Sequence, residues 1–269
     1  CILPFILLIA SSFSSEADLT KYGYSFIPRG FTLAAYKYIW AIKENILRAY
    51  GMSFLITGIG TVINLVMTLL FAYPLSRKDL PGRKWISFFL FFTMLFNGGF
   101  VPTYLIYSNV FHITDTLAAM IVPYLLMNAF YVIMMRTYIM TNVPVEVIEA
   151  SMIDGANEFQ NLARIVVPMS KPIIGTIGLM SAIAYWNNWT NGIYFIQSRR
   201  NLYGIQNYLN SVISNVAFLQ THSVGSGIVT ADLPSISIRM ALAVIAIIPV
   251  LVAYPFFQKS FVAGITVGS

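Results

Sequence analysis

A polar interruption between two long apolar runs holds the residues of this chain that are best placed to do chemistry. It covers residues 149–168 and reads EASMIDGANEFQNLARIVVP, with carboxylates, amides and a glycine set among apolar residues at helical spacing. A plain connection between two helices needs only a few residues. Because the segment is much longer than that and strongly amphipathic, the sequence predicts a surface element that binds another protein.

Motifs for catalysis are missing from the sequence. It contains no GxxxxGK[ST] phosphate loop, no HExxH zinc motif and no GxSxG nucleophile elbow. The single cysteine excludes an internal disulfide, and His112 and His222 lie too far apart for metal-ligand spacing. We therefore predict that the chain is not an enzyme, binds no metal and does not itself hydrolyse ATP.

The composition indicates that the bilayer is the solvent of this chain. Apolar residues make up 58% of the sequence and charged residues only 10%, which is far from the composition of a water-soluble domain. A span of the hydrocarbon core takes roughly 20 apolar helical residues. The chain has runs of that length, and it lacks the short alternating segments of a membrane barrel, so we predict an all-α membrane protein.

Six transmembrane helices are expected within a single transmembrane domain, residues 1–269. The first run is too short to cross the membrane, so that helix is expected to be truncated at its N-terminal end; a lipidated Cys1 is the lesser alternative. The segment 14–48 leaves room for a short interfacial helix outside. The expected spans are residues 1–13, 49–73, 85–107, 116–135, 173–196 and 236–257.

Lysine and arginine in short loops indicate the orientation, because they accumulate on the cytoplasmic side. The loop 74–84 carries four cations, whereas the loop 108–115 carries none. Loops alternate between sides, so the segment 136–172 and the tail after Lys259 are expected in the cytoplasm. Other lysines and arginines fall in loops that we place outside the cell, which weakens the bias of positive charge toward the cytoplasmic side. We read the net charge of +6 as balance against the membrane surface and predict no nucleic-acid binding.

Local signals predict a short helix over residues 144–154. Pro144 suits a first helical position, and Gly155 suits the left-handed residue that follows a helix end. Val145, Ile148 and Met152 recur at helical spacing and make one apolar stripe.

A second short helix is expected to follow at once. Asn157 and Gln160 have the spacing of a capping pair at a helix start. Pro168 and Pro172 are expected to end the helix before the next span. Its predicted apolar stripe consists of Phe159, Leu162, Ala163 and Val166.

At these residues the chain resembles the permease subunits of ATP-binding-cassette (ABC) importers. Their cytoplasmic signature is Glu-Ala-Ala, three residues, Gly, nine residues, then Ile-x-Leu-Pro. Ser151 and Val167 depart from it by small or apolar exchanges, and Asp154 and Ala156 flank the glycine as they commonly do in the family. The matching positions are Glu149, Ala150, Gly155, Ile165 and Pro168.

Further segments look like the sugar-importing branch, particularly its complex-oligosaccharide permeases. These are NGGFVPTY at residues 97–104, the group Trp186, Asn187 and Trp189, and YPFFQKSFVAGITVG at residues 254–268. The resemblance implies the type I importer permease fold in a bacterial inner membrane.

The same resemblance implies a set of partners. They are a second homologous permease in a heterodimer, two ATPase subunits that bind ATP and Mg, an extracytoplasmic sugar-binding protein and an oligosaccharide, with no cofactor in this chain. The family's signature loop docks into a cleft of an ATPase subunit. By that resemblance Glu149, Ala150, Asp154 and Gly155 take this role here.

Carbohydrates bind to aromatic faces and to convergent amides, and polar groups within spans must face protein or water. One short stretch supplies both kinds of group, and amides in other spans add to it. The alternative is that the amides bond neighbouring helices and the aromatic residues lie in an interfacial belt. The candidate substrate path consists of Asn97, Asn128, Tyr185, Trp186, Asn187, Asn188 and Trp189, with Asn64 as a further intramembrane amide.

Two other classes of membrane protein remain as alternatives. An ion-coupled secondary carrier would usually bury Asp or Glu at mid-membrane, and the expected spans lack both in their cores. A membrane scaffold or sensor subunit would lack a partner ATPase. Arg199 and Arg200 leave acidic cargo as the lesser expectation.

Overall fold

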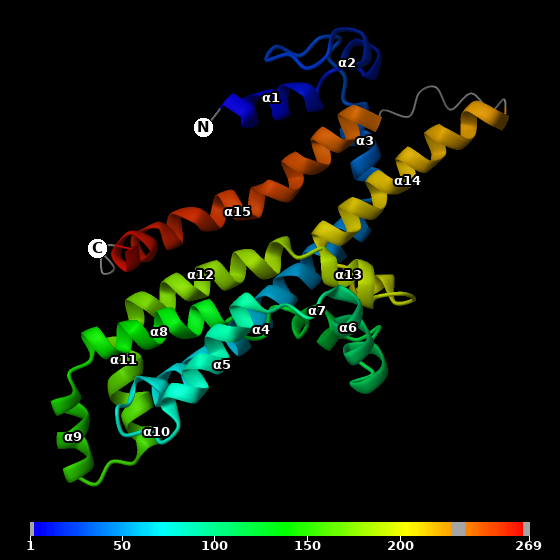
Figure 1. Ribbon diagram of the computed structural model, residues 1–269. Coiled ribbons are helices and arrows are strands. Elements are labelled where there is room, and N and C mark those ends of the chain that lie inside the picture. Colours follow the sequence, from blue (N-terminus) through cyan, green and yellow to red (C-terminus); the bar gives the residue numbers. More distant parts are fainter. Residues whose placement is uncertain (1–2, 227–234, 266–269) are drawn as a thin grey trace. The chain divides into compact units, whose positions relative to one another are not determined.

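The computed structural model describes residues 3–226 and 235–265, and within them it contains helices and no strand (Figure 1). The expected all-α class agrees with these residues. They divide into two compact units, which are described separately. Unit 1 comprises Cys1–Ser53, Asn188–Ile193 and Arg199–Tyr254, and unit 2 comprises Phe54–Asn187, Tyr194–Ser198 and Pro255–Ser269. Residues 266–268 of the family-like C-terminal segment and the side chain of His222 lie outside the described part.

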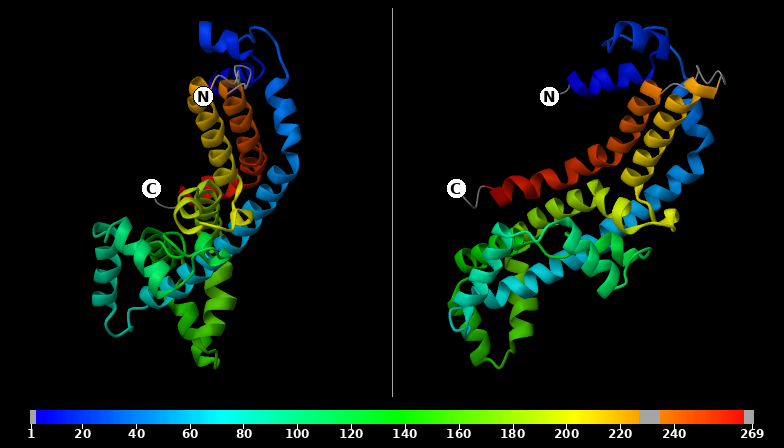
Figure 2. Two further views of the ribbon diagram at one scale, coloured as in Figure 1. Left: turned by 90° about the vertical axis from the view of Figure 1, so that its right-hand side faces the viewer. Right: turned by 45° about the vertical axis from the view of Figure 1, so that its right-hand side comes forward.

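Unit 1 gathers the N-terminal helices, the start of α4 and the two long helices α14 and α15, the latter as far as Tyr254. In Figure 2, α14 and the first half of α15 both flank the start of α4. The carboxylate of Glu16 accepts hydrogen bonds from the backbone N–H groups of Ile236 (2.9 Å) and Ser237 (3.1 Å), and so caps α15. The helices are α1 (Leu3–Ser12), α2 (Glu16–Tyr22), α3 (Ala34–Ala41), the first part of α4 (Lys43–Ser76), a 3-10 turn (Arg200–Leu202), α14 (Ile205–Ser226) and most of α15 (Ser235–Ile265).

Helix α14 was not predicted from the sequence. It has an apolar stripe at spacings of four, three and four residues, and all four of its members are buried: Ile205, Leu209, Val212 and Val216. Many polar residues between them hide this stripe from a search for long apolar runs. The start of α14 is fixed by Ser53, whose Oγ accepts a hydrogen bond from the Ile205 N–H at 2.7 Å.

Unit 2 is built around α8, which contacts both α5 and α12. Its buried face, which includes Val132, Met135 and Ile139, packs into one core with residues of α4, α5 and α12. The elements are the rest of α4, α5 (Arg83–Leu95), α6 (Phe100–Leu105), a π-helical segment (Ile106–Val110), α7 (Leu117–Ile121), α8 (Ala129–Asn142), α9 (Val145–Ile153), α10 (Glu158–Asn161), a second π-helical segment (Leu162–Val166), α11 (Val167–Met169) and α12 (Lys171–Asn187); α13 (Thr190–Phe195) is divided between the units.

The described helices do not reproduce six continuous spans. Among them, α4 alone is long and apolar enough to cross a membrane, or up to three spans result if each of two bent pairs counts as one. The pair Arg83–Leu95 with Phe100–Val110 bends by 114°, and the pair Glu158–Met169 with Lys171–Asn187 bends by 83°. The number of spans therefore stays a prediction.

The expected span 85–107 is wrong as a single helix. Helix α5 ends at Leu95, and α6 starts only at Phe100. Gly99 between them adopts φ +86°, a conformation that breaks a right-handed helix. The expected span 173–196 is likewise interrupted, since α12 ends at Asn187 and α13 begins at Thr190.

The expected span 116–135 is also broken, between α7 and α8. Pro123 has no N–H for a helical hydrogen bond, and Tyr124 adopts φ +65°. The carbonyls freed by the break are bonded by side chains of other helices in the unit. Asn64 Nδ2 of α4 donates to the carbonyl of Leu125 (2.8 Å), and Tyr185 Oη of α12 donates to that of Ile121 (3.0 Å). Irregular backbone at membrane depth requires this kind of protein partner.

Candidate functional site

The first helix of the polar loop forms as the sequence predicts. Helix α9 covers Val145–Ile153, and Pro144 is its N-cap, one position earlier than expected. Gly155 has φ +86°. Its N–H donates to the Met152 carbonyl (3.0 Å), and the Ala156 N–H donates to that of Ser151 (2.9 Å). These two bonds form a Schellman cap, which needs a residue in the left-handed region.

The second helix starts as predicted but continues differently. Asn157 and Gln160 form the reciprocal capping box. A π-helical segment, Leu162–Val166, follows after one turn. A π turn adds a residue and shifts the phase of the helix. The predicted stripe is therefore wrong in part: Leu162 and Val166 are buried, whereas Phe159 is 72% exposed and Ala163 is exposed as well.

The inner face of the loop is packed against the core of unit 2. Ile148, Leu162 and Val166 are buried in the same apolar cluster as residues of α4 and α8, and Met152 packs against it. Val145 is exposed, so it does not belong to the buried stripe. This apolar packing seats α9 on unit 2 as part of its core.

Polar contacts fix the loop at two further points. Ser151 Oγ donates to Oδ1 of the fully buried Asn161 at 2.6 Å, which joins α9 to α10. Glu158 accepts a hydrogen bond from the hydroxyl of Tyr73 and lies 3.7 Å from Nη2 of Arg77. Arg77 also pairs with Asp79 at 3.2 Å, and this hydrogen bond holds the pKa of Asp79 below its ordinary value. Together these contacts hold the loop to the end of α4.

The outer face of the loop is exposed. Glu149, Ala150, Asp154 and Gly155 are all exposed. Figure 1 shows α9 and α10 next to each other at one end of unit 2, beyond the ends of α8 and α12. Ile153 is 88% exposed on the same helix. A rigid element with a mixed acidic and apolar outer face is suited to bind a partner protein.

Residues 69–267 match the family described as "Binding-protein-dependent transport system inner membrane component". The chain belongs to this family. It is an ABC importer permease subunit, as the loop signature indicated, and neither a secondary carrier nor a scaffold.

Two relatives from Bacillus subtilis (strain 168) match this chain along its whole length. Protein LplC is 36% identical over 270 residues, covering 100% of this permease and 88% of the relative. The polygalacturonan/rhamnogalacturonan transport system permease protein YtcP is 36% identical over 271 residues, covering 100% and 92%. The resemblance to the sugar-importing branch is thereby confirmed.

A solved structure supports the fold. A chain of a bacterial ABC transporter involved in the import of the acidic polysaccharide alginate matches with a TM-score of 0.81 and 28% identity. The match covers 97% of this permease and 90% of that chain. The type I importer permease fold is confirmed.

In this permease, two of the candidate cargo residues use their polar atoms near a helix end. Asn97 Oδ1 accepts from the Gly99 N–H (2.9 Å) in the break before α6. Asn128 Oδ1 accepts from the Phe130 N–H (2.9 Å) and caps α8. Both side chains are exposed, so these local bonds leave their amide nitrogens accessible.

The stretch 185–189 is split at the end of α12. Tyr185 and Trp186 are buried in unit 2, where the ring centroid of Trp186 lies 5.2 Å from that of Phe54. Asn187 ends α12 with an exposed side chain. In unit 1, Asn188 Oδ1 accepts from the Asn191 N–H (3.2 Å), and Trp189 is 51% exposed. A cargo role for these residues stays a prediction, with Asn187 and Trp189 as the members that present exposed side chains.

Two exposed apolar residues, Ile153 and Phe159, were not predicted as part of the docking set. The sequence carried a signal for Ile153, because it lies off the apolar stripe of an amphipathic helix. Phe159 was assigned to the wrong face, because the π-helical segment that shifts the following residues out of phase with it has no sequence signature that we recognised.

Proposed function

We propose that this permease translocates an oligosaccharide that an extracytoplasmic binding protein delivers, driven by ATPase subunits that dock on the loop 149–168. The observation that carries the proposal is α9, which is packed and hydrogen-bonded on its inner face while Glu149, Ala150 and Asp154 are exposed on its outer face. A seated helix of this kind can transmit a rigid-body movement, whereas a mobile loop would absorb it.

The mechanism is a two-state coupling. ATP binding closes two ATPase subunits, moves the docked α9 helices of two permeases together and biases the permeases toward facing outward. Hydrolysis resets the pair. The loop's tie to α4 through Glu158, Tyr73 and Arg77 carries the movement into a helix long enough to cross the membrane.

The partners in this proposal are a second homologous permease, two ATPase subunits with bound ATP and Mg, and the sugar-binding protein. The loop and the C-terminal tail lie in the cytoplasm of a bacterial cell. These assignments rest on the charge pattern of the loops and on what the family resemblance implies.

The cargo is an oligosaccharide, and the names of two similar proteins favour one derived from an acidic polysaccharide. YtcP is named for polygalacturonan and rhamnogalacturonan, and the similar solved structure belongs to an alginate importer. In this chain Arg199 and Arg200 are exposed. We assign contact with cargo to the candidate residues whose side chains are exposed, which are Asn97, Asn128, Asn187 and Trp189.

The substitution Gly155→Val tests the docking role. Valine is strained at φ +86°, and no other residue crowds this position, so the change should misplace the end of α9 without overpacking. The variant should keep its fold and lose uptake by at least tenfold in cells that express all the partners. Gly23→Val is the matched control, because Gly23 has φ +73° and equally open surroundings, but lies in unit 1.

Two measurements separate the parts of the proposal. Co-purification of ATPase subunits with the Gly155→Val variant reports docking, and normal uptake by this variant would contradict the coupling role. ATPase stimulation by binding protein loaded with neutral or uronic-acid oligosaccharides reports the cargo. Equal stimulation by unloaded binding protein would contradict delivery of a saccharide.

A further inference from the structure

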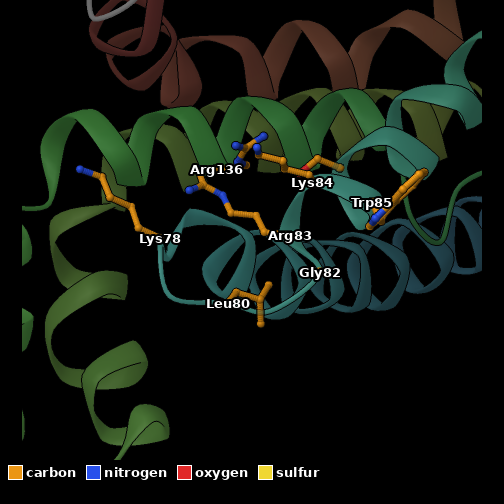
Figure 3. Close-up of a pocket in the computed structure, with 8 residues that line it drawn as sticks. Lys78, Leu80, Gly82, Arg83, Lys84, Trp85 and Arg136 are labelled. Atoms are coloured by element: carbon orange, nitrogen blue, oxygen red, sulfur yellow. The ribbon is translucent and has the colours of Figure 1, made fainter.

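A basic pocket lies in unit 2 between the loop that follows α4, the start of α5 and α8. It is open, with a volume of about 650 Å³, and four of the eight residues that line it are cations: Lys78, Arg83, Lys84 and Arg136. Figure 3 shows Arg83 and Arg136 pointing toward one another with Lys84 beside them, while Lys78 and Trp85 lie at opposite ends. The docking loop plays no part in lining it.

The positive charge of this pocket is not neutralised within the described residues. The two ion pairs found there both involve Arg77, and none involves a cation of the pocket. Arg136 Nε donates to a neutral group, the Leu75 carbonyl, at 3.0 Å. Burial and then the nearby charge of Arg83 lower the pKa of Arg136. Like charges held this closely favour a bound anion.

A serine hydroxyl and the start of α5 add to the attraction for an anion. Ser87 lines the pocket, and its buried Oγ has no hydrogen-bond partner among the described residues. Helix α5, of 13 residues, begins at Arg83 without a side-chain cap. The N–H groups of Arg83, Trp85 and Ile86 already donate to the carbonyls of Leu80 and Gly82. The helix start therefore contributes the positive end of its dipole, which favours an anion nearby.

The surroundings of the pocket distinguish a lipid from a soluble anion. Trp85 at its edge is 70% exposed, and the next turns of α5 expose Phe88, Phe89 and Phe92. An exposed aromatic at the end of an apolar helix is typical of a membrane interface. The cations thus lie at headgroup level, next to an aromatic surface that acyl chains can cover.

We propose that this pocket binds the phosphate of an anionic phospholipid, with Arg83, Lys84 and Arg136 around the phosphate, Ser87 donating to it, and the acyl chains along α5. This site is separate from the docking surface of α9. The inference requires only that the chain is a membrane protein, which its family shows, and does not depend on the docking role of α9.

The test uses the assembled importer in lipid nanodiscs and measures retained lipid by native mass spectrometry. Phosphatidylglycerol and phosphatidylcholine with the same acyl chains are compared, and inorganic phosphate is the soluble competitor. We expect retention of phosphatidylglycerol alone, with no displacement by phosphate at equal concentration. The variant Arg83→Gln/Lys84→Gln should bind phosphatidylglycerol about 30-fold more weakly, given about 1 kcal/mol for each cation near a membrane surface.

Two further variants distinguish a specific lipid-binding site from nonspecific electrostatic attraction of anionic lipid. Ser87→Ala keeps every charge and should weaken binding about fivefold, the usual effect of one hydrogen bond. Lys37→Gln/Lys171→Gln removes the same charge from exposed positions outside the pocket and should change binding less than twofold.

Three results would overturn the proposal. Equal losses in the pocket variant and the charge control would mean nonspecific attraction. Displacement of the lipid by equimolar phosphate would mean that the site takes a soluble anion. Release of an ATPase subunit by Arg83→Gln/Lys84→Gln, with unchanged lipid retention, would mean that the cations bind an acidic protein surface.

Discussion

Two interruptions of the helical runs in unit 2 use their polar groups in opposite ways. In the loop that contains α9, apolar side chains pack inward and the carboxylates of Glu149 and Asp154 are exposed. In the break between α7 and α8, the backbone is irregular, and polar side chains of α4 and α12 bond its carbonyls. A polar residue is thus available for a partner only where the fold has not already used its hydrogen-bonding groups.

The largest effect on stability is expected at Asn64, the polar side chain that the break between α7 and α8 uses most. It is 1% exposed and donates to two carbonyls of the break. Asn64→Ala should lower the free energy of unfolding by about 2 kcal/mol, because buried carbonyls lose their donor. Thermal unfolding in detergent measures the change. Asn109→Ala, at an exposed position, is the control and should change stability by less than about 0.5 kcal/mol. Equal effects of the two substitutions would show that the break does not depend on this amide.

A smaller effect is expected at Tyr185, whose hydroxyl bonds the Ile121 carbonyl and whose ring lies over Gly60. Tyr185→Phe keeps the ring and should cost about 1 kcal/mol of stability. Apparent affinity for cargo should stay within about twofold if the hydroxyl serves the fold. A tenfold loss of affinity in transport assays, with unchanged unfolding, would instead make Tyr185 a cargo contact.

The smallest effect on stability is expected at Ile153, because a side chain that is 88% exposed contributes little to the folded state. Ile153→Ser should change the free energy of unfolding by less than about 0.5 kcal/mol. It should nevertheless reduce co-purification of the ATPase subunits, since the outer face of α9 loses its most exposed apolar side chain. Undiminished co-purification would restrict the docking face to the acidic residues.

The local features of the loop could be predicted from the sequence. Proline before α9, Gly155 after it, and the Asn157–Gln160 capping box act through contacts within a few residues, so their spacing is sufficient evidence. The family signature covers the same positions. The π-helical segment after α10 was missed, and with it the outward direction of Phe159.

The helices of the membrane region were predicted less well. Long apolar runs indicated where helices lie, but a run is equally apolar whether it forms one helix or two that meet at an angle. The breaks at Phe96–Gly99 and between α7 and α8 depend on glycine conformation and on distant partners such as Asn64 and Tyr185. Helix α14 was missed because its buried stripe is narrow and its composition is polar.

By itself, the amino-acid sequence determined the helical class, the membrane environment, the caps of α9 and α10 and the family of the chain, because these follow from composition and from neighbours a few residues apart. The tertiary structure decided which side chains face outward on α9 and which side-chain amides form hydrogen bonds to the carbonyls of a broken helix. It also decided that four cations from two parts of the chain line one pocket. Those outcomes depend on contacts between residues far apart in sequence, which spacing along a single chain does not encode.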